Sequence, residues 1–188
     1  MLFGEAPGPR GADQSGIPFW GDRAGILVYR ALEAAGLAVV PAPAYQHWDG
    51  ARFRELGLAP ELRGAALSNA YPSCPTRDGQ TFRAPTDAEL RHPDNLARLQ
   101  AELHRAAAGN ATPLRVITLG KRAHWIFQRL EAAPAFQLHG LPHPSSQGLL
   151  QAAPGKGKGL KLADLQAQWQ AQLAGLLRLP AGEGHANL

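Results

Sequence analysis

Three side chains combine a chemistry suited to holding a flat ring with positions next to predicted loops: Phe19, Asn69 and His143. Asn69 ends an apolar run, and its amide offers a donor and an acceptor side by side, which matches the imide edge of a heterocycle. His143 lies between two prolines, where a rigid loop could hold it as a hydrogen-bond donor to a developing oxyanion. Phe19 lies between Pro18 and Trp20 and could serve as a stacking platform.

Each of these side chains also has a simpler interpretation. An asparagine at a strand end is often a turn former, a lone histidine is usually a surface or packing residue, and an apolar residue in such a loop usually belongs to the core. The residue types alone leave both interpretations open.

Residues 4–25, GEAPGPRGADQSGIPFWGDRAG, form a loop with six glycines and three prolines. No GK[ST] follows, and the spacing is not GxGxxG, so the standard phosphate-binding patterns are absent. Two interpretations remain: a tight turn between a strand and a helix, or a backbone that approaches a flat ligand closely. The second explains the glycines better than a phosphate cradle does, and the tight turn stays an equal alternative.

The composition limits the class of protein. A length of 188 residues suits one domain with a true core, and a net charge of +4 is compatible with nucleic acid without proving it. No 18 consecutive residues are apolar, so we expect no membrane span, and the first residues lack the plan of a signal peptide, which indicates a cytoplasmic protein. The single cysteine, Cys74, excludes an intrachain disulfide framework and any cysteine-only zinc or iron–sulfur site.

Strands alternate with helices along the chain. Strands are predicted at 1–4, 37–40, 64–69, 114–119 and 136–138, helices at 23–35, from 93, from 120 and at 162–176, and a loop with one or two turns at 41–63. Thr86 and Glu89 form a capping-box pair. The pattern predicts an α/β fold: a three-layer α/β/α arrangement with a central, mainly parallel four-stranded sheet. We expect one domain over 1–178, a flexible tail at 179–188, and a ligand at the carboxyl ends of the strands.

Several segments resemble motifs of the uracil-DNA glycosylase superfamily, in the right order over residues 1 to about 175. The segment 4–25 resembles the first motif of bacterial and archaeal families four and five: GEAPG is family-four-like, and the spacing to GIPFWGDRAG is similar to family five. LSNAYPSCP (67–75) resembles the strand that carries the base-reading asparagine, and HPSSQ (143–147) the closing motif. PTDAEL (85–90) and VITLGKRAHWIF (116–127) resemble the segments between.

The resemblance implies excision of uracil, or a related deaminated base, from DNA after the nucleotide is flipped out of the helix. Phe19 would then stack on the flipped ring, Asn69 would read its imide edge, and His143 would stabilise negative charge at O2. Gly4 and Ala6 would contribute to substrate binding, with the backbone around Glu5 and Ala6 near the same oxygen.

Cleavage of the glycosidic bond also needs a carboxylate that orients or deprotonates water. Glu5 and Asp13 are the candidates, with Asp22 behind them; a helix cap is an alternative role for Asp22.

The resemblance further implies contacts with DNA in the segment after His143. Ser145, Ser146, Gln147 and Leu149, followed by Leu150, would form a loop that fills the vacated stack. Lys156 and Lys158, with Lys161, would meet phosphates. The alternatives are leucines that pack under the last helix and lysines on an ordinary solvated surface.

The chain departs from families four and five in lacking their four cluster cysteines, so no iron–sulfur cofactor and no metal site are expected. We expect packing of Tyr71 and Phe82 to hold the loop at 72–80 instead. Ala6 stands where some members carry a polar residue that activates water.

The expected partner is DNA containing uracil or another deaminated base, and the expected state is a monomer. An enzyme that prefers hypoxanthine or xanthine, and a catalytically silent or weak DNA-binding or damaged-base-binding protein, are the alternatives.

Overall fold

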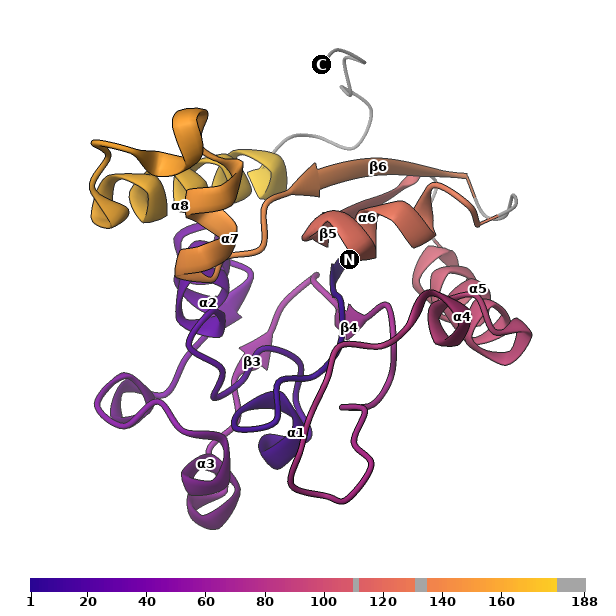
Figure 1. The fold of residues 1–188 in the computed structure, drawn as a ribbon, viewed down its shortest axis with the longest axis horizontal. Coiled ribbons are helices and arrows are strands. Elements are labelled where there is room, and N and C mark those ends of the chain that lie inside the picture. The colour runs from indigo at the N-terminus through magenta and orange to yellow at the C-terminus, as the bar shows by residue number, and fades with distance from the viewer. Residues whose placement is uncertain (110–111, 131–134, 179–188) are drawn as a thin grey trace.

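A central sheet of four parallel strands organises the protein. The computed structural model describes residues 1–109, 112–130 and 135–178. The strands are β1 (Leu2–Gly4), β4 (Leu67–Asn69), β5 (Leu114–Leu119) and β6 (Phe136–Leu141), in the order β4-β1-β5-β6 (Figure 1). Every neighbouring pair is parallel. The predicted α/β fold with a parallel four-stranded sheet is therefore confirmed.

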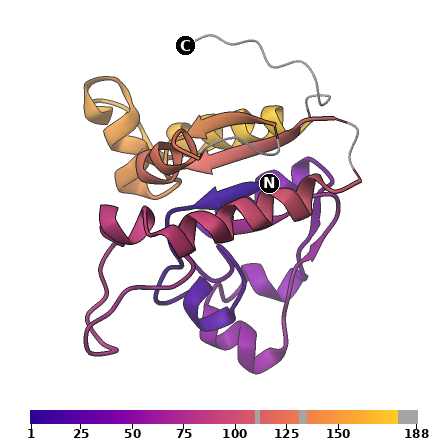
Figure 2. The same cartoon turned by 90° about the vertical axis from the view of Figure 1, so that its right-hand side faces the viewer.

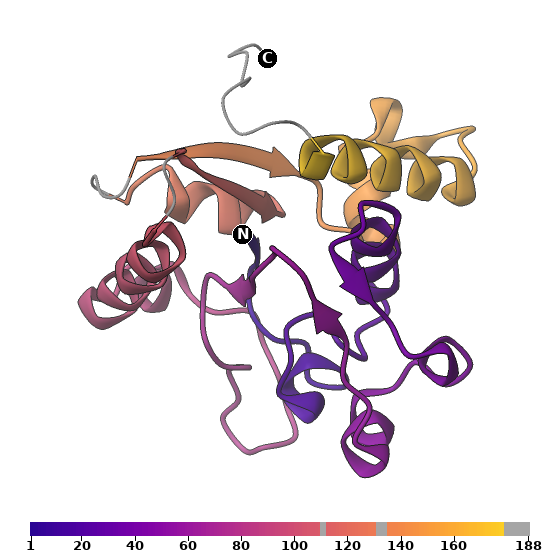
Figure 3. The same cartoon turned by 180° about the vertical axis from the view of Figure 1, so that it is seen from behind.

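The two faces of the sheet are covered by different helices, because successive side chains of a strand point to opposite faces. Leu2 and Ile117 belong to a core shared with α2 (Gly25–Ala34) and α8 (Leu162–Arg178), which lie next to each other in Figure 3. Phe3 and Val116 belong to a second core shared with α5 (Pro93–Ala107) and α6 (Lys121–Phe127). Figure 2 looks onto that side, with α5 in front. The result is a three-layer arrangement.

Short elements complete the fold. They are α1 (Ala12–Ser15), α3 (Gly50–Leu56), α4 (Asp87–Leu90), α7 (Ser146–Ala152), the 3₁₀ turns η1 (Ala42–Tyr45) and η2 (Pro154–Gly157), and a two-stranded antiparallel sheet of β2 (Ala38–Val39) and β3 (Glu61–Leu62). The Thr86 side chain accepts a hydrogen bond from the Glu89 N–H while the Glu89 carboxylate accepts one from the Thr86 N–H, so the predicted capping box is confirmed.

The predictions for 37–69 were partly wrong. The apolar run 37–40 does not join the central sheet, because it pairs only with β3. The predicted loop 41–63 contains α3, which begins where the Asp49 side chain accepts a hydrogen bond from the Arg52 N–H and ends at Gly57 in the left-handed conformation. The strand predicted from 64 begins only at Leu67, since Gly64 has a φ of +67° and turns the chain.

An aromatic cluster ties these connecting segments to the first loop. Trp20 packs against Tyr29, Trp48 and Phe53, with ring centroids 4.4–4.9 Å apart. The Trp20 indole donates to the Leu58 carbonyl at 2.9 Å, and the Trp48 indole donates to the Asp22 carbonyl at 2.7 Å. The cluster thus fixes the far end of the glycine-rich loop, which must place Phe19 at the sheet edge.

No helix within the described part of the chain is both long and apolar enough to cross a membrane. The predicted flexible tail at 179–188 lies outside the described residues, and the single domain over 1–178 stays a prediction.

Candidate active site

The carboxyl ends of the four strands bring distant segments to one edge of the sheet. Gly4, at the end of β1, pairs with Asn69, at the end of β4. On the other side, the Gly120 N–H after β5 donates to the Leu141 carbonyl at the end of β6, at 2.8 Å. Ligands of parallel sheets bind at this edge.

Phe19 and Asn69 meet at Gly4. A Cβ atom at Gly4 would lie 2.6 Å from Asn69 Oδ1 and 2.9 Å from Phe19 Cε1, so any larger residue there would push these two side chains out of place. Phe19 has a φ of +64°, which is rare for a bulky residue and marks backbone strain. The ring is only 6% exposed and also belongs to the core around α2. The strained turn therefore brings an aromatic ring close to the amide that could read a base.

The amide of Asn69 is available, while its backbone is held firmly. Within the described residues, no protein group hydrogen-bonds to the Asn69 side chain, which is 7% exposed and lines a cavity of about 290 Å³. The Arg98 guanidinium donates to the Asn69 and Ala70 carbonyls, each at 3.0 Å. Asn95 donates to the Ala70 carbonyl at 2.9 Å. A fixed strand end thus carries a free donor and acceptor.

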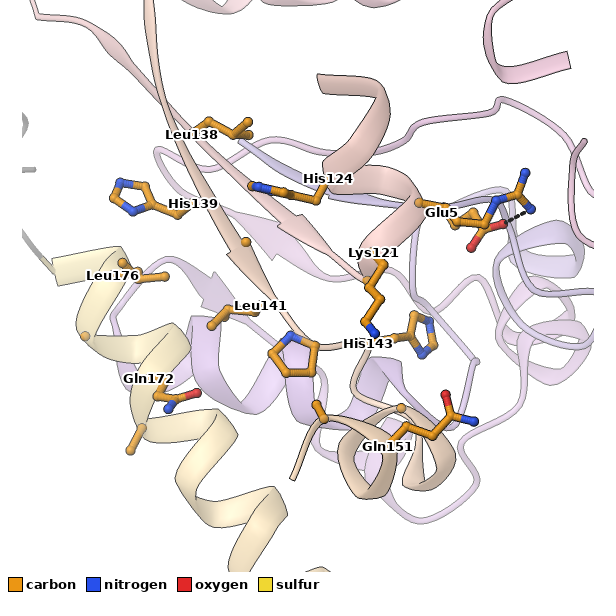
Figure 4. Close-up of a pocket in the computed structure, with 18 of the residues that line it drawn as sticks. Glu5, Lys121, His124, Leu138, His139, Leu141, His143, Gln151, Gln172 and Leu176 are labelled. Carbon is orange, nitrogen blue, oxygen red and sulfur yellow. Dashed lines mark hydrogen bonds and ion pairs between the residues drawn. The ribbon is translucent and has the colours of Figure 1, made fainter. Parts of the chain in front are cut away.

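His143 is held in a neutral form with its proton directed away from its own loop. Its Nδ1 accepts a hydrogen bond from the Ser145 N–H at 3.2 Å, so Nε2 carries the proton of the neutral ring. Burial lowers the pKa of His143, because the charged form is poorly solvated there. The ring lines a second cavity, of about 1260 Å³, beside Lys121 and Gln151 (Figure 4). This arrangement can donate a hydrogen bond to an anion at neutral pH.

Glu5 follows Gly4 and lines the same larger cavity as His143. Its Oε1 accepts a hydrogen bond from Arg122 at 3.0 Å, and the same guanidinium donates to Asp87 at 2.6 Å. Burial raises the pKa of Glu5, and Arg122 opposes that shift. Figure 4 shows Glu5 with its ion pair at one end of the cavity and His139 with Leu176 at the other.

The other two candidate carboxylates have different surroundings. Asp13 is exposed and lines the smaller cavity with Asn69. Asp22 lies inside the loop, where its Oδ2 accepts from the Ala12 N–H at 3.3 Å and the backbone of Gly8 and Gly11 also donates to it. Burial nevertheless raises the pKa of Asp22. Asp22 is not the cap of α2, whose N-cap position is occupied by Ala24.

The glycines of the loop mostly serve the loop itself. A Cβ atom at Gly8 would lie 2.1 Å from Asp22 Oδ1, and one at Gly11 would lie 2.1 Å from the Asp22 nitrogen. At Gly25 it would lie 1.7 Å from the Phe19 carbonyl oxygen. The expectation that the glycines of this loop approach a ligand is therefore wrong for Gly8, Gly11 and Gly25, whereas Gly4 lies beside Asn69 and Gly16 lines the smaller cavity.

The structure joins the predicted site residues in two groups. Phe19 and Asn69 converge on Gly4, whereas Glu5 and His143 line the larger cavity. Neither of the two cavities at this edge contains Phe19, Asn69 and His143 together. The consecutive residues Gly4 and Glu5 connect the groups, and half-buried Ala6 follows them.

The segment after His143 requires one correction. The Ser145 hydroxyl caps α7 by accepting from the Gly148 N–H at 3.1 Å, and Ser146 and Gln147 are exposed. Leu149 is only 4% exposed and packs in the core with Trp169 of α8. Leu149 therefore cannot act as an exposed wedge in this structure, and the alternative of packing under the last helix is correct.

The lysines of η2 and the residue after it lie on the surface. Lys156 and Lys158 are exposed, and Lys156 has a φ of +56° between two glycines that also have positive φ. Their geometry is compatible with contact to phosphates.

The loop at 72–85 is held by polar contacts. Asp78 accepts hydrogen bonds from the N–H groups of Gln80 and Thr81, and Arg83 pairs with Glu89 at 2.6 Å. Phe82 is 38% exposed, so the predicted packing by Phe82 is wrong. Tyr71 does pack against the core around α5.

Cys74 lies close enough to Asp13 and Asp22 for their charges to add to burial in raising the pKa of its thiol. One thiol does not fit an iron–sulfur cluster, which needs several cysteine ligands. In the described ranges, no group of three or more histidine, cysteine or acidic residues is placed to hold a metal ion.

Sequence reasoning missed the arginines that support the site. Arg98 and Arg122 contact backbone and carboxylate groups from distant segments. The helical spacing of Asn95, Arg98 and Glu102 was the available signal for the first, because residues three and four apart share a helix face. No local signal pairs Arg122 with Glu5, which lies 117 positions away.

Comparison with known proteins supports one family. A search of curated proteins returned no match for the chain. A family model described as "Uracil DNA glycosylase superfamily" matches residues 1–169, which include β1, Asn69, His143 and the first half of α8. The chain therefore belongs to the uracil DNA glycosylase superfamily, and its general role is that of a DNA-repair glycosylase.

Proposed function

We propose that the protein excises uracil, or a closely related deaminated base, from DNA by hydrolysing the N-glycosidic bond. The observation that carries the proposal is the amide of Asn69, which has no hydrogen-bond partner within the described residues and lies with the Phe19 ring beside Gly4, where a Cβ atom would displace both side chains. An amide with a free donor and acceptor next to an aromatic ring suits a flat base with an imide edge.

In this mechanism the target nucleotide leaves the helix and its base enters the edge of the sheet. Phe19 stacks on the ring, and Asn69 donates to one carbonyl oxygen while accepting from N3–H. The backbone at Gly4 and Ala6 approaches from the end of β1. Flipping an undamaged pair costs a few kcal/mol, and stacking and hydrogen bonds of this kind can stabilise the flipped base by a similar amount.

The bond between C1′ and N1 then breaks, and its electron pair leaves with the base. The Nε2–H of His143 donates to O2 of the departing anion. A neutral ring suits this role because it remains a donor without requiring a buried cation. One preorganised donor of this kind lowers the activation barrier by about 3–4 kcal/mol.

Water completes the reaction at C1′. We assign Glu5 to orient it: the oxygen of the water bonds to C1′, and its proton passes to the carboxylate. Asp13 is the second candidate, since it is exposed at the cavity that Asn69 lines. Ser145 positions the turn, and Ser146, Gln147, Lys156 and Lys158 are proposed to contact the DNA backbone.

The test is base release from duplex DNA with a single uracil, read as strand cleavage after alkali, with hypoxanthine and xanthine substrates in parallel. We expect release of uracil by the wild type and a loss of about 10²–10³-fold in Asn69→Ala and in His143→Ala. His104→Ala, at an exposed histidine on α5, is the matched control and should keep full activity.

Two outcomes contradict the proposal. Release that neither substitution weakens would show that the site is elsewhere in the fold. Binding of uracil-containing DNA without release of any base would identify a silent binding protein instead.

A further inference from the structure

Arg122 joins two carboxylates that come from different parts of the chain. Its NH1 donates to Glu5 at 3.0 Å and its NH2 donates to Asp87, on α4, at 2.6 Å. The Arg122 side chain is 34% exposed and that of Glu5 is 27% exposed, so the pair is partly shielded from solvent. Such a pair retains more of its strength than one on the open surface.

The local structure on both sides fixes this contact. Arg122 is the second residue of α6, which starts directly after Gly120, a residue with a φ of +101° at the end of β5. Asp87 is the first residue of α4, immediately after the capping-box threonine. The Arg122 guanidinium is therefore held between the first turns of two helices, one fixed by the turn at Gly120 and the other by the capping box.

Only one oxygen of Glu5 is engaged. Among the described residues, the Glu5 side chain bonds to Arg122 through Oε1, and no protein donor contacts Oε2. The other charged or titratable groups that line this cavity are Lys121, His124, His139 and His143. None of them is hydrogen-bonded to Glu5, so the free oxygen remains open to a water molecule.

We propose that Arg122 is a positioning residue that holds Glu5 with one carboxylate oxygen engaged and the other open to the attacking water, and that Asp87 tempers the strength of that hold. The proposal rests on the proposed function, in which Glu5 orients the water.

The electrostatics give the two neighbours opposite effects. Burial raises the pKa of Glu5, Arg122 lowers it by charge and hydrogen bond, and Asp87 raises it by charge. Removing the Arg122 charge should therefore raise the pKa of Glu5 further, and removing the Asp87 charge should lower it. The opposite signs follow from the opposite charges of Arg122 and Asp87, so the link to the attacking water is tested by the pH dependence of base release.

The experiment measures single-turnover base release against pH for the wild type, Arg122→Gln, Arg122→Lys and Asp87→Asn. We expect the acidic limb of the profile to move up by about one pH unit in Arg122→Gln and to move down in Asp87→Asn. Arg122→Lys should restore part of the shift, because lysine keeps the charge but not the two-pronged geometry. Arg129→Gln, at an exposed arginine just after α6, is the control and should leave the limb in place.

A second measurement separates failure of this proposal from failure of the proposed function. NMR titration of the Glu5 carboxyl reports the same opposite shifts whether or not the protein releases a base. Shifts of the same sign in both variants, or no shift in either, overturn the proposal. Weaker DNA binding by Arg122→Gln with an unmoved limb also overturns it, since Arg122 would then be a phosphate contact.

Discussion

Two glycine-rich segments of this protein use glycine for different reasons. In the loop at 4–25, side chains or backbone of the protein itself fill the space that a Cβ atom would need at Gly8, Gly11 and Gly25. In the segment at 154–161, Gly155 and Gly159 have positive φ and nothing within 4 Å of the added Cβ position. Gly8, Gly11 and Gly25 are thus needed for close packing, whereas Gly155 and Gly159 are needed for their backbone conformation.

The comparison shows that glycine density does not by itself locate a ligand. The first segment was expected to approach a flat ligand and the second to meet phosphates, yet Gly8 and Gly11 of the first close around the carboxylate of Asp22. What distinguishes a ligand-facing glycine is a neighbour with unused hydrogen-bonding capacity. Gly4 beside Asn69 meets that description.

Adding a methyl group at one glycine of each segment tests this difference most directly. Gly25→Ala places a Cβ atom at 1.7 Å from the Phe19 carbonyl oxygen, so we expect a loss of about 3 kcal/mol or more in the free energy of unfolding. The Cβ atom in Gly159→Ala would have no neighbour within 4 Å. We therefore expect a loss of only about 1 kcal/mol in the free energy of unfolding, because alanine disfavours the left-handed backbone at this position. Denaturant unfolding of both variants measures the difference, and equal losses would contradict it.

Removing the carboxylate at the centre of the first loop should have the next largest effect. Asp22→Ala leaves the backbone N–H groups of Gly8, Gly11 and Ala12 without this acceptor, so we expect a loss of about 2 kcal/mol. Asp13→Ala, on the exposed side of the same loop, is the control and should change stability little. Thermal unfolding of the two variants measures the losses, and a lower melting temperature for Asp13→Ala than for Asp22→Ala would contradict the prediction.

His143 should make the free energy of unfolding decrease as the pH falls into the mildly acidic range. Because burial places the pKa of His143 below the ordinary value of 6.5, the unfolded chain takes up a proton before the folded one does as pH falls. The contribution of neutral His143 is thus fully present above about pH 6.5 and declines below it. Between about pH 7.5 and about pH 5, the free energy of unfolding should decline more steeply with falling pH for the wild type than for His143→Gln. Parallel curves for the two proteins would contradict a neutral His143 in the folded state.

The smallest effect concerns the exposed lysines of the second segment. The double substitution of Lys156→Gln and Lys158→Gln should leave stability unchanged and reduce the slope of log affinity for DNA against log salt by about 2, because each lysine neutralises one phosphate. Arg52→Gln, on the exposed surface of α3, is the control and should keep the slope. A slope that the lysine substitutions leave intact would place these residues outside the DNA-binding surface.

Much of the fold could be predicted because it depends on local patterns. Alternating strands and helices predicted the parallel sheet, and the spacing of Thr86 and Glu89 predicted the capping box. One prediction failed where pairing is not local, since the run at 37–40 joins a separate small sheet. The other failure was local, because α3 was missed although Asp49 and Gly57 mark its ends.

The sequence by itself determined the types of chemistry available and the order of the motifs, because residue identity and spacing along the chain are local properties. Only the tertiary structure decided which neighbours complete each group. It buried Leu149 beneath α8, enclosed Asp22 within its own loop, and set Arg98 and Arg122 against Asn69 and Glu5. These contacts join residues far apart in the chain, and their energies depend on distances and burial that exist only once the sheet and its helices have packed.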